Sequence, residues 1–210
     1  MHLPRRTFLT TTALAAIALP LGPSLALAQG SGDPRLGERG IGRPDAPVRV
    51  TEFFSLTCSH CAAFHRETFP RVKRDLVETG AIRLIWRDFP LDQLALLAAA
   101  VARSLPAERY EGFIGALLSS QDRWAFTRGD PVEELAKMAA LAGMPRAQFD
   151  QVAKDDGLKR AILEQRQQAE REFSIQATPS FAFVGRATRT QSGNMPFERF
   201  LQLVEEAKRG

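Results

Sequence analysis

Two cysteines, Cys58 and Cys61, enclose a serine and a histidine and are the only cysteines among the chain's 210 residues. The β-branched and aromatic run at 48–54 is typical of a buried strand, and apolar residues recur at helical spacing from Ser59 onward. Two thiols about one helical turn apart lie close enough to form and break a disulfide without unfolding the chain. The spacing therefore indicates a redox site at the start of a helix.

Thiol-disulfide exchange needs one exposed thiolate that attacks and one sheltered thiol that resolves the mixed disulfide. If Cys58 caps the helix that begins at Ser59, its sulfur faces unpaired backbone N–H groups and the positive end of the helix dipole. A protonated His60 would favour the thiolate further. We therefore expect Cys58 to attack and Cys61, one turn inside the helix, to resolve. A stabilised thiolate leaves readily, so the oxidised pair should donate its disulfide.

The same cysteine spacing also occurs in metal sites. Cys58, Cys61 and His65 fall on one helical face, and His60 is nearby. However, the chain has no second pair of cysteines, and its remaining histidine is His2. A copper or zinc site and two inert buried cysteines therefore remain alternatives to redox chemistry. Apart from the metal alternative, we expect His65 to be a surface or packing residue.

Residues 1–28 differ in composition from the rest of the chain. Arg5 and Arg6 precede an apolar stretch, and this segment contains no acidic residue. The pattern is typical of a signal peptide cleaved after Ala28, and the start is similar to a twin-arginine export signal. The apolar stretch is too short and interrupted for a convincing membrane span, although an uncleaved anchor is an alternative. Export leads to an oxidising compartment, where a cysteine pair can form a disulfide.

Composition and charge limit the classes of function. The chain is 44% hydrophobic and 25% charged, enough for one sizeable core or for a domain with a large insertion. Beyond residue 28 there are 26 basic and 24 acidic side chains, and the two signs are interspersed. This balance argues against a dedicated nucleic-acid binder. Trp86 and Trp124 are expected to be core or groove aromatics.

The elements around the cysteines form a predicted strand-helix-strand unit. A strand at 48–54 leads into a helix at about 59–78, and a second strand lies at 82–86. Pro70 falls inside this helix and should kink it, because proline has no N–H to donate. Residues 29–47 are rich in glycine, proline and charge, which indicates a loose lead-in.

The remainder of the chain is predicted to be a helical block followed by strands. Residues 91–173 contain no convincing strand, and their apolar residues recur at helical spacing. We expect helices at about 92–104, 107–120, 131–142, 146–153 and 157–173, then strands at 180–184 and about 187–191, and a final helix at about 196–208.

The segment from Glu52 to Cys61 closely resembles the active site of the DsbA family, thioredoxin-fold oxidases of the bacterial cell envelope. The sequence around Thr178 and Pro179 is similar to the loop whose proline is cis in thioredoxin-like proteins and lies against the two cysteines. A helical insertion separates these segments, as in DsbA-like folds. The resemblance extends over about 48–208. It implies an α/β thioredoxin-like domain formed by residues 48–90 and 174–210, with an inserted all-helical subdomain at 91–173.

The resemblance also implies roles for individual residues. Cys58 attacks, Cys61 resolves, and His60 stabilises the reduced thiolate. Glu52, on the first predicted strand, matches a buried acid that assists proton transfer, although a surface carboxylate is its alternative. The residues expected to contact the substrate are Thr178, Pro179 and Ser59.

DsbA-type proteins are periplasmic thiol-disulfide oxidoreductases. The resemblance therefore implies that the Cys58–Cys61 disulfide passes to reduced exported proteins, and that a quinone-linked membrane partner of DsbB type reoxidises the pair. No metal, nucleotide or flavin cofactor and no membrane-integral mature form are expected. Ser59 stands where DsbA-type sites usually have proline, and Thr178 also occurs in isomerase-type relatives. A disulfide reductase or isomerase on the same scaffold therefore remains an alternative.

Overall fold

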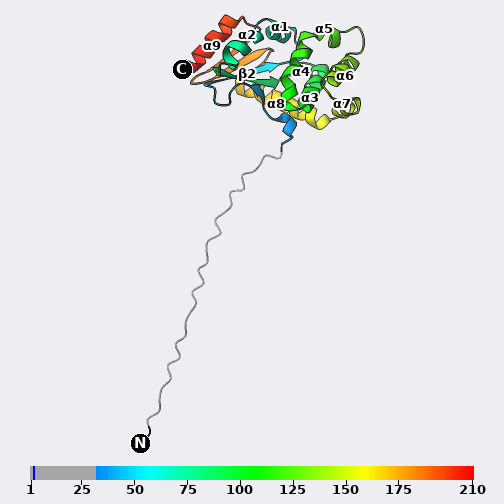
Figure 1. The fold of residues 1–210 in the computed structure, drawn as a ribbon, viewed down its shortest axis with the longest axis horizontal. Coiled ribbons are helices and arrows are strands. Elements are labelled where there is room, and N and C mark those ends of the chain that lie inside the picture. Colours follow the sequence, from blue (N-terminus) through cyan, green and yellow to red (C-terminus); the bar gives the residue numbers. More distant parts are fainter. Residues whose placement is uncertain (1, 3–31) are drawn as a thin grey trace. The chain divides into compact units, whose positions relative to one another are not determined.

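The computed structural model describes residue 2 and residues 32–210. The predicted signal peptide and its cleavage after Ala28 lie outside the described residues, His2 apart. Residues 32–210 form one compact unit built on a five-stranded sheet (Figure 1). In the order in which they lie side by side, the strands are β1 (Arg39–Ile41), β3 (Ile82–Asp88), β2 (Val48–Phe54), β4 (Ser180–Val184) and β5 (Thr188–Ser192).

The predicted strands are confirmed, and their observed ends differ from the predicted ends by at most two residues. The central pair, β2 and β3, is parallel, and the neighbouring pairs are antiparallel. On the face toward α1 both strands are buried along their whole length, and the opposite face is only partly covered. The parallel register places the carboxyl end of β2, which leads to the cysteine motif, beside the carboxyl end of β3.

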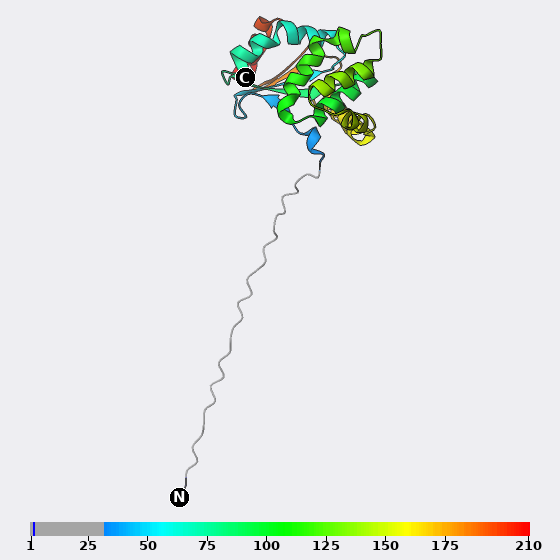
Figure 2. The ribbon, with the colours of Figure 1, turned by 45° about the vertical axis from the view of Figure 1, so that its right-hand side comes forward.

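The predicted helices are also present in the described part of the chain, and the helical block follows the strand-helix-strand unit as expected (Figures 1 and 2). A short helix that the periodicity did not predict, α5, precedes α6. The helices are α1 (Ser59–Glu67), α2 (Phe69–Val72), the π-helix η2 (Lys73–Val77), α3 (Gln93–Ser104), α4 (Ala107–Ser119), α5 (Gln121–Trp124), α6 (Pro131–Leu141), α7 (Arg146–Ala153), α8 (Asp156–Phe173) and α9 (Phe197–Arg209).

Pro70 interrupts the helix that carries the cysteines, as predicted. α1 ends at Glu67, and Thr68 caps it with a backbone N–H that donates to the Phe64 carbonyl at 2.9 Å. Pro70 occupies the first turn of α2, where its missing N–H costs nothing. The Thr68 hydroxyl donates to the Met195 carbonyl at 2.8 Å and fixes the break against the segment before α9.

The two faces of the sheet bury different groups of side chains. On one face, Phe181 of β4 packs against Phe64 of α1, with ring centroids 4.7 Å apart. On the other face, Phe53 of β2 belongs to a small cluster that includes Ala169 of α8. Successive side chains of a strand point to opposite faces, so Glu52, next to Phe53, points toward α1.

The segment predicted to be a loose lead-in is instead partly ordered into structure. Residues 34–36 form a 3₁₀ turn, η1 (Pro34–Leu36), and the next three-residue strand, β1, pairs antiparallel with β3. A Cβ on Gly40 would lie 2.6 Å from the Leu84 carbonyl oxygen, so only glycine allows this close approach. Arg103 of α3, paired with Asp88, donates to the backbone carbonyls of η1 and its cap at 3.1 Å.

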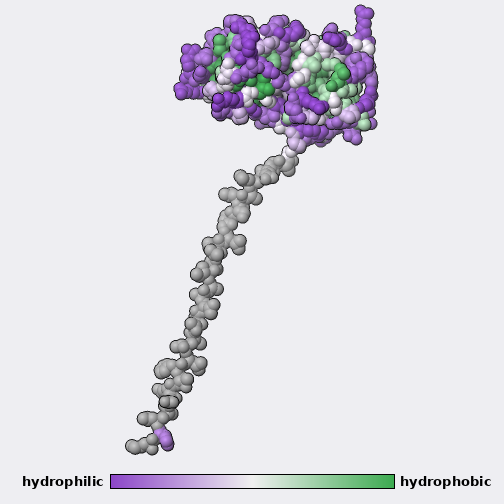
Figure 3. Space-filling view, in the orientation of Figure 1, coloured by the Kyte–Doolittle hydropathy of each residue, from purple (hydrophilic) through white to green (hydrophobic). Residues whose placement is uncertain are grey.

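Both tryptophans are core residues, since Trp86 is 2% exposed and Trp124 is fully buried. The face of the molecule in Figure 3 is largely hydrophilic, as the interspersed charges predict, with apolar side chains gathered over α4 and α6. Among these, Leu141 is 86% exposed at the end of α6. In the described residues no helix combines the length and the apolar character needed to cross a membrane.

Candidate redox site

Cys58 occupies the N-cap of α1, as predicted. Its backbone is extended (φ −81°, ψ 118°), and its carbonyl accepts the first helical hydrogen bond, from the Ala62 N–H at 3.1 Å. The first N–H groups of a helix have no partner inside it, and those of His60 and Cys61 act on the Cys58 sulfur. The β2–α1 connection thus places a thiol where the backbone favours negative charge.

The Thr178–Pro179 peptide, which is cis, lies directly against this sulfur. The Cys58 thiol donates to the Thr178 carbonyl, with Sγ and oxygen 3.3 Å apart. The loop is held in place because the Gly193 N–H donates to the Pro179 carbonyl at 2.8 Å. The structure therefore brings together two segments that are 120 residues apart in the sequence.

Cys58 is more sheltered than the sequence suggested. It is only 8% exposed, because the loop before β4 covers it, whereas the expected attacking thiol was an exposed one. Cys61 is fully buried, and both cysteines are free thiols in this structure. Ser59 and His60 are exposed and form the accessible part of the motif. Solvent therefore reaches the motif at these two residues.

The pKa of the Cys58 thiol is lowered to about 5. The hydrogen bond from the Cys61 thiol is the largest cause, followed among the stabilising groups by the Thr178 side chain and the backbone N–H groups of Cys61 and His60, while burial opposes them. The Thr178 hydroxyl is buried and has no hydrogen-bond partner by distance and angle within the described residues. His60 acts here through its backbone, whereas the sequence argument relied on its imidazole.

The pKa of the Cys61 thiol is shifted in the opposite direction. Burial raises the pKa of its thiol far above the ordinary value, and the negative charges of Cys58 and Glu52 raise it further. Glu52 of β2 is fully buried, so it is the buried acid of the prediction and not a surface carboxylate. One acidic thiol beside one thiol that keeps its proton is the asymmetry that attack and resolution require.

Two residues at the site were missed by the sequence analysis. Gln121 of α5 is buried and donates from Nε2 to the carbonyls of Leu56 and Cys58, at 2.8 and 3.1 Å. No motif marks this glutamine. His65, expected to be a surface or packing residue, places Nε2 3.1–3.2 Å from both carboxyl oxygens of Glu52. Its position four residues after Cys61, on the same helical face, was the available signal.

The metal alternative required Cys58, Cys61 and His65 to converge. The His65 imidazole faces Glu52 instead, and within residues 32–210 no group of three or more histidine, cysteine or acidic side chains has the geometry of a metal site. The donor set that the alternative proposed is therefore not assembled in the described part of the chain.

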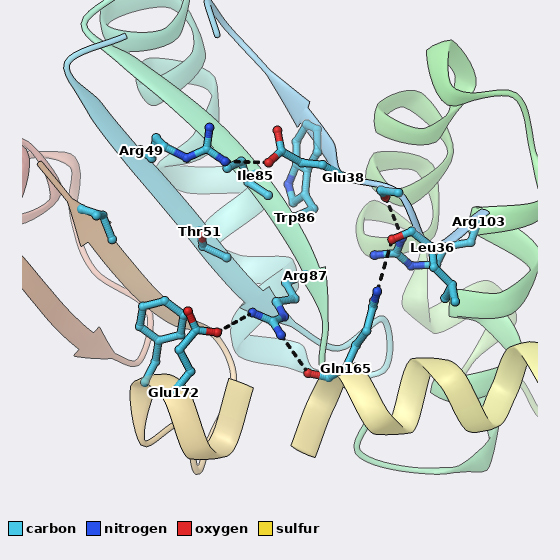
Figure 4. Close-up of a pocket in the computed structure, with 13 residues that line it drawn as sticks. Leu36, Glu38, Arg49, Thr51, Ile85, Trp86, Arg87, Arg103, Gln165 and Glu172 are labelled. Carbon is cyan, nitrogen blue, oxygen red and sulfur yellow. Dashed lines mark hydrogen bonds and ion pairs between the residues drawn. The ribbon is translucent and has the colours of Figure 1, made fainter. Parts of the chain in front are cut away.

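A pocket of about 370 Å³ lies away from the cysteines, on the other face of the sheet (Figure 4). Arg49 and Thr51, which line it, alternate along β2 with residues that face α1. Its charged side chains pair with one another: Arg49 lies 2.6 Å from Glu38, and Arg87 lies 3.4 Å from Glu172. This pocket does not contribute to the cysteine site.

The comparisons with known proteins agree with the fold and the site. A family model described as thioredoxin matches residues 35–206, so the chain belongs to the thioredoxin family. Within that family, its structure is similar to DsbA proteins. The α-DsbA1 of Wolbachia pipientis superimposes with a TM-score of 0.73 and 28% sequence identity, over 82% of this chain and 92% of that one. The predicted DsbA resemblance and the thioredoxin-like fold with a helical insertion are confirmed.

Curated relatives carry related names. A putative protein-disulfide oxidoreductase of Rickettsia felis is 28% identical over 168 residues, which cover 80% of this chain and 59% of the relative. A probable disulfide bond formation protein D of Bacillus anthracis is 25% identical over 149 residues, 68% of each chain. The chain thus spans about three fifths of the length of the Rickettsia relatives it matches.

The acidity of Cys58 leads to a first prediction. Alkylation of the reduced protein by iodoacetamide should reach half its maximal rate near pH 5, against about pH 8.5 for an ordinary thiol. The rate should rise with pH because only the thiolate reacts. Thr178→Val keeps the side-chain shape but removes the hydroxyl, and it should move the midpoint upward by less than about one unit.

Ser192→Ala is the matched control for this titration. It also removes a hydroxyl, but one that lies 2.8 Å from the Ser180 hydroxyl, and it should leave the midpoint unchanged. A wild-type midpoint near pH 8.5 would show that the surroundings of Cys58 do not stabilise its thiolate.

Proposed function

We propose that the protein is a thiol-disulfide oxidoreductase that donates the Cys58–Cys61 disulfide to pairs of thiols in other proteins. The observation that carries this proposal is the acidic Cys58 thiol, held between the start of α1 and the Thr178–Pro179 loop, next to the buried Cys61 thiol. A substrate thiolate attacks the Cys58 sulfur, and Cys61 leaves as a thiolate. A second substrate thiolate then attacks the mixed disulfide and releases Cys58, so the substrate loses two electrons and the protein gains them.

The acidity of Cys58 supports an oxidising direction. The pKa of Cys58 is about 5, well below that of an unfolded thiol near 8.5, so ionisation stabilises the folded dithiol protein. This stabilisation is fully present above the pKa of the unfolded thiol and is lost as the pH falls through about 5. The disulfide form has no thiolate and gains nothing. At neutral pH this contribution favours the reduced form over the disulfide form, which makes the disulfide a stronger oxidant.

The substrate site is proposed to be the accessible rim of Cys58. The loop of Thr178 and Pro179, whose side chains are buried, lies on one side, and the exposed Ser59 lies on the other. An extended peptide can lie beside the loop before β4 because its backbone groups can bind the loop in the manner of an added strand. His60, exposed beside the sulfur, faces the same approach.

The setting of this activity is proposed to be the bacterial periplasm, with reduced exported proteins as substrates. The signal-peptide pattern of residues 1–28 supports export, and an oxidising compartment suits a disulfide donor. The related proteins are named for disulfide chemistry. Each turnover leaves the dithiol form, so a further oxidant must remove two electrons. A quinone-linked membrane protein of DsbB type is the proposed partner for that step.

The equilibrium with glutathione tests the direction. The reduced and oxidised forms should reach balance at a potential above about −180 mV, nearer the strongly oxidising end of the thioredoxin family than thioredoxin itself at about −270 mV. Acid trapping followed by mass measurement of the alkylated thiols gives the ratio. A potential below about −250 mV would instead favour a reductase, kept reduced by a different membrane partner.

A further inference from the structure

We infer that the helical insertion carries a binding site for a fatty acid, formed by an apolar groove along α4 and α6 and by a cluster of arginines at one end of this groove. The groove takes the aliphatic chain, and the arginines take the carboxylate. This binding function goes beyond thiol-disulfide exchange, since neither part of the site is lined by Cys58, Ser59 or the Thr178–Pro179 loop.

The groove has the size and the lining of a site for a small apolar group. It encloses about 600 Å³, and its side chains belong to the apolar surface over α4 and α6 in Figure 3. Leu141 exposes 86% of its surface there, and contiguous apolar surface of this kind often marks a binding site. The apolar residues that line the groove are Phe113 and Ala116 of α4, Met138 and Leu141 of α6, and Ala142, which caps α6.

A second pocket, of about 410 Å³, adjoins the groove, because Arg109 and Gly143 line both. None of the described residues that line this second pocket is acidic. Pro106, the N-cap of α4, also lines it, so the positive end of the α4 dipole faces the same space. The arginines that line it are Arg35 of η1, Arg39 of β1, Arg103 of α3 and Arg109 of α4. The pocket is therefore suited to an anion.

Two of these arginines are already paired with carboxylates. Arg35 lies 2.5 Å from Asp33 and 2.8 Å from Asp155, and Arg103 pairs with Asp88. The four arginines and these three aspartates together carry one net positive charge. That charge matches the single negative charge of a carboxylate better than the charge of a phosphate group, which approaches two.

The other two arginines keep donors for a ligand. Arg39 Nη2 donates to the Arg103 carbonyl at 3.4 Å, and Arg109 Nη1 donates to the Ala142 carbonyl at 2.8 Å. The buried Nε of Arg39 has no hydrogen-bond partner in the described part of the chain. A guanidinium group has five N–H donors and binds a carboxylate through two of them at once, so Arg39 and Arg109 can both contribute to the head-group site.

Arg109 stands where the two parts of the site meet. Gly143, in the turn after α6, has a positive φ of 87°, and a Cβ at this position would lie 2.2 Å from Arg109 Nη1. Glycine therefore provides both the backbone conformation and the space that let the guanidinium lie against this turn. A carboxylate bound by Arg109 would leave its aliphatic chain at the entrance of the apolar groove.

Calorimetric titration of the full chain with dodecanoate, below the concentration at which it forms micelles, tests the site. Dodecanoate should saturate a single site. Octanoate, which has a shorter chain, should bind at least about tenfold more weakly, because each buried CH₂ group adds to the affinity. Dodecyl maltoside has the same chain length and no charge, and it should also bind at least about tenfold more weakly, because it cannot pair with a guanidinium group.

Two variants test the two parts of the site. Leu141→Ser removes an apolar side chain that is largely exposed, so the variant should fold normally and bind dodecanoate about fivefold more weakly. Arg109→Gln removes a charge from the head-group site and should weaken binding about tenfold. The matched controls are Leu201→Ser on α9 and Arg186→Gln between β4 and β5, both exposed and outside the two pockets.

Both control variants should bind dodecanoate within about twofold of the wild type. All four variants should retain the wild-type rate of thiol-disulfide exchange, since none of them alters the cysteine site. Loss of exchange by the wild type would therefore count against the proposed function and not against the fatty-acid site.

Three results would overturn the fatty-acid site. The first is a titration that does not saturate, or saturable binding that Leu141→Ser and Arg109→Gln leave unchanged. The second is equally tight binding of dodecyl maltoside, which would show that the arginines do not recognise the head group. The third is sedimentation of the protein with phosphatidylglycerol vesicles without binding of dodecanoate, which would make this surface a membrane contact.

Discussion

Replacing Cys58 with alanine is expected to abolish thiol-disulfide exchange, with a loss on the order of a thousandfold or more. Cys58 is the thiol that ionises at neutral pH, since its pKa is about 5, and Cys61 is fully buried with a raised pKa. The remaining thiol therefore has neither the charge nor the access to attack a substrate. The rate at which the reduced protein opens the disulfide of a two-cysteine peptide measures the effect.

The Cys58→Ala variant should fold normally, which makes its loss of activity interpretable. Cys58 makes no side-chain hydrogen bond that caps α1, so alanine at this N-cap should cost less than about 1 kcal/mol of stability. The reduced wild-type protein is the control for thermal unfolding. Retention of more than a few per cent of the exchange rate by a folded variant would move the attacking role to another group.

The strands and long helices could be predicted because local pattern and tertiary environment agree in them. The apolar residues of β2 lie in a strand with one fully buried face, and the Ala-rich repeat of α3 packs inside the helical block. β1 and α5 could not be predicted in the same way. β1 is three residues long and contains Gly40, which β-sheet preference disfavours, and α5 has only four residues. Both are ordered by distant partners: β3 for the strand, and the cysteine loop for Gln121.

Part of the candidate site could likewise be predicted from the sequence, and part could not. The placement of Cys58 at a helix start followed from one short motif, and the contact with the Thr178 loop followed from the family resemblance. The burial of Cys58 did not follow, because it depends on how closely that loop approaches. The pairing of Glu52 with His65 was also missed. It depends on tertiary packing, because it joins a strand to a helix that packs on that strand.

The helical insertion has a role at the site that neither the motif nor the resemblance revealed. Gln121 donates to the carbonyls of Leu56 and Cys58, so α5 fixes the turn that leads from β2 into α1. The insertion is therefore bonded directly to the backbone of Cys58. The Cys58 carbonyl, which the Gln121 amide binds, also accepts the first hydrogen bond of α1. Gln121 thereby helps to orient the N–H groups that act on the Cys58 sulfur.

Replacing Cys61 with alanine is expected to trap mixed disulfides between Cys58 and its substrates. The variant keeps the attacking thiol but lacks the sulfur that displaces a bound substrate, so each adduct persists until an external thiol removes it. Non-reducing electrophoresis and mass measurement after incubation with a disulfide-bonded peptide should show a one-to-one adduct at Cys58. The Cys58→Ala, Cys61→Ala double variant should show none.

The same substitution should make Cys58 less acidic. The Cys61 thiol is the largest cause of the lowered pKa of Cys58, so its removal should shift the alkylation midpoint upward from about 5. Adduct formation should then be slower than wild-type attack at pH 6 but recover by pH 8, where the thiolate forms again. A Cys61→Ala variant that alkylates readily yet accumulates no adduct at either pH would contradict the division of roles between the two cysteines. Persistent adducts with a midpoint still near pH 5 would instead show that the backbone N–H groups of α1 and Thr178 are sufficient to hold the thiolate.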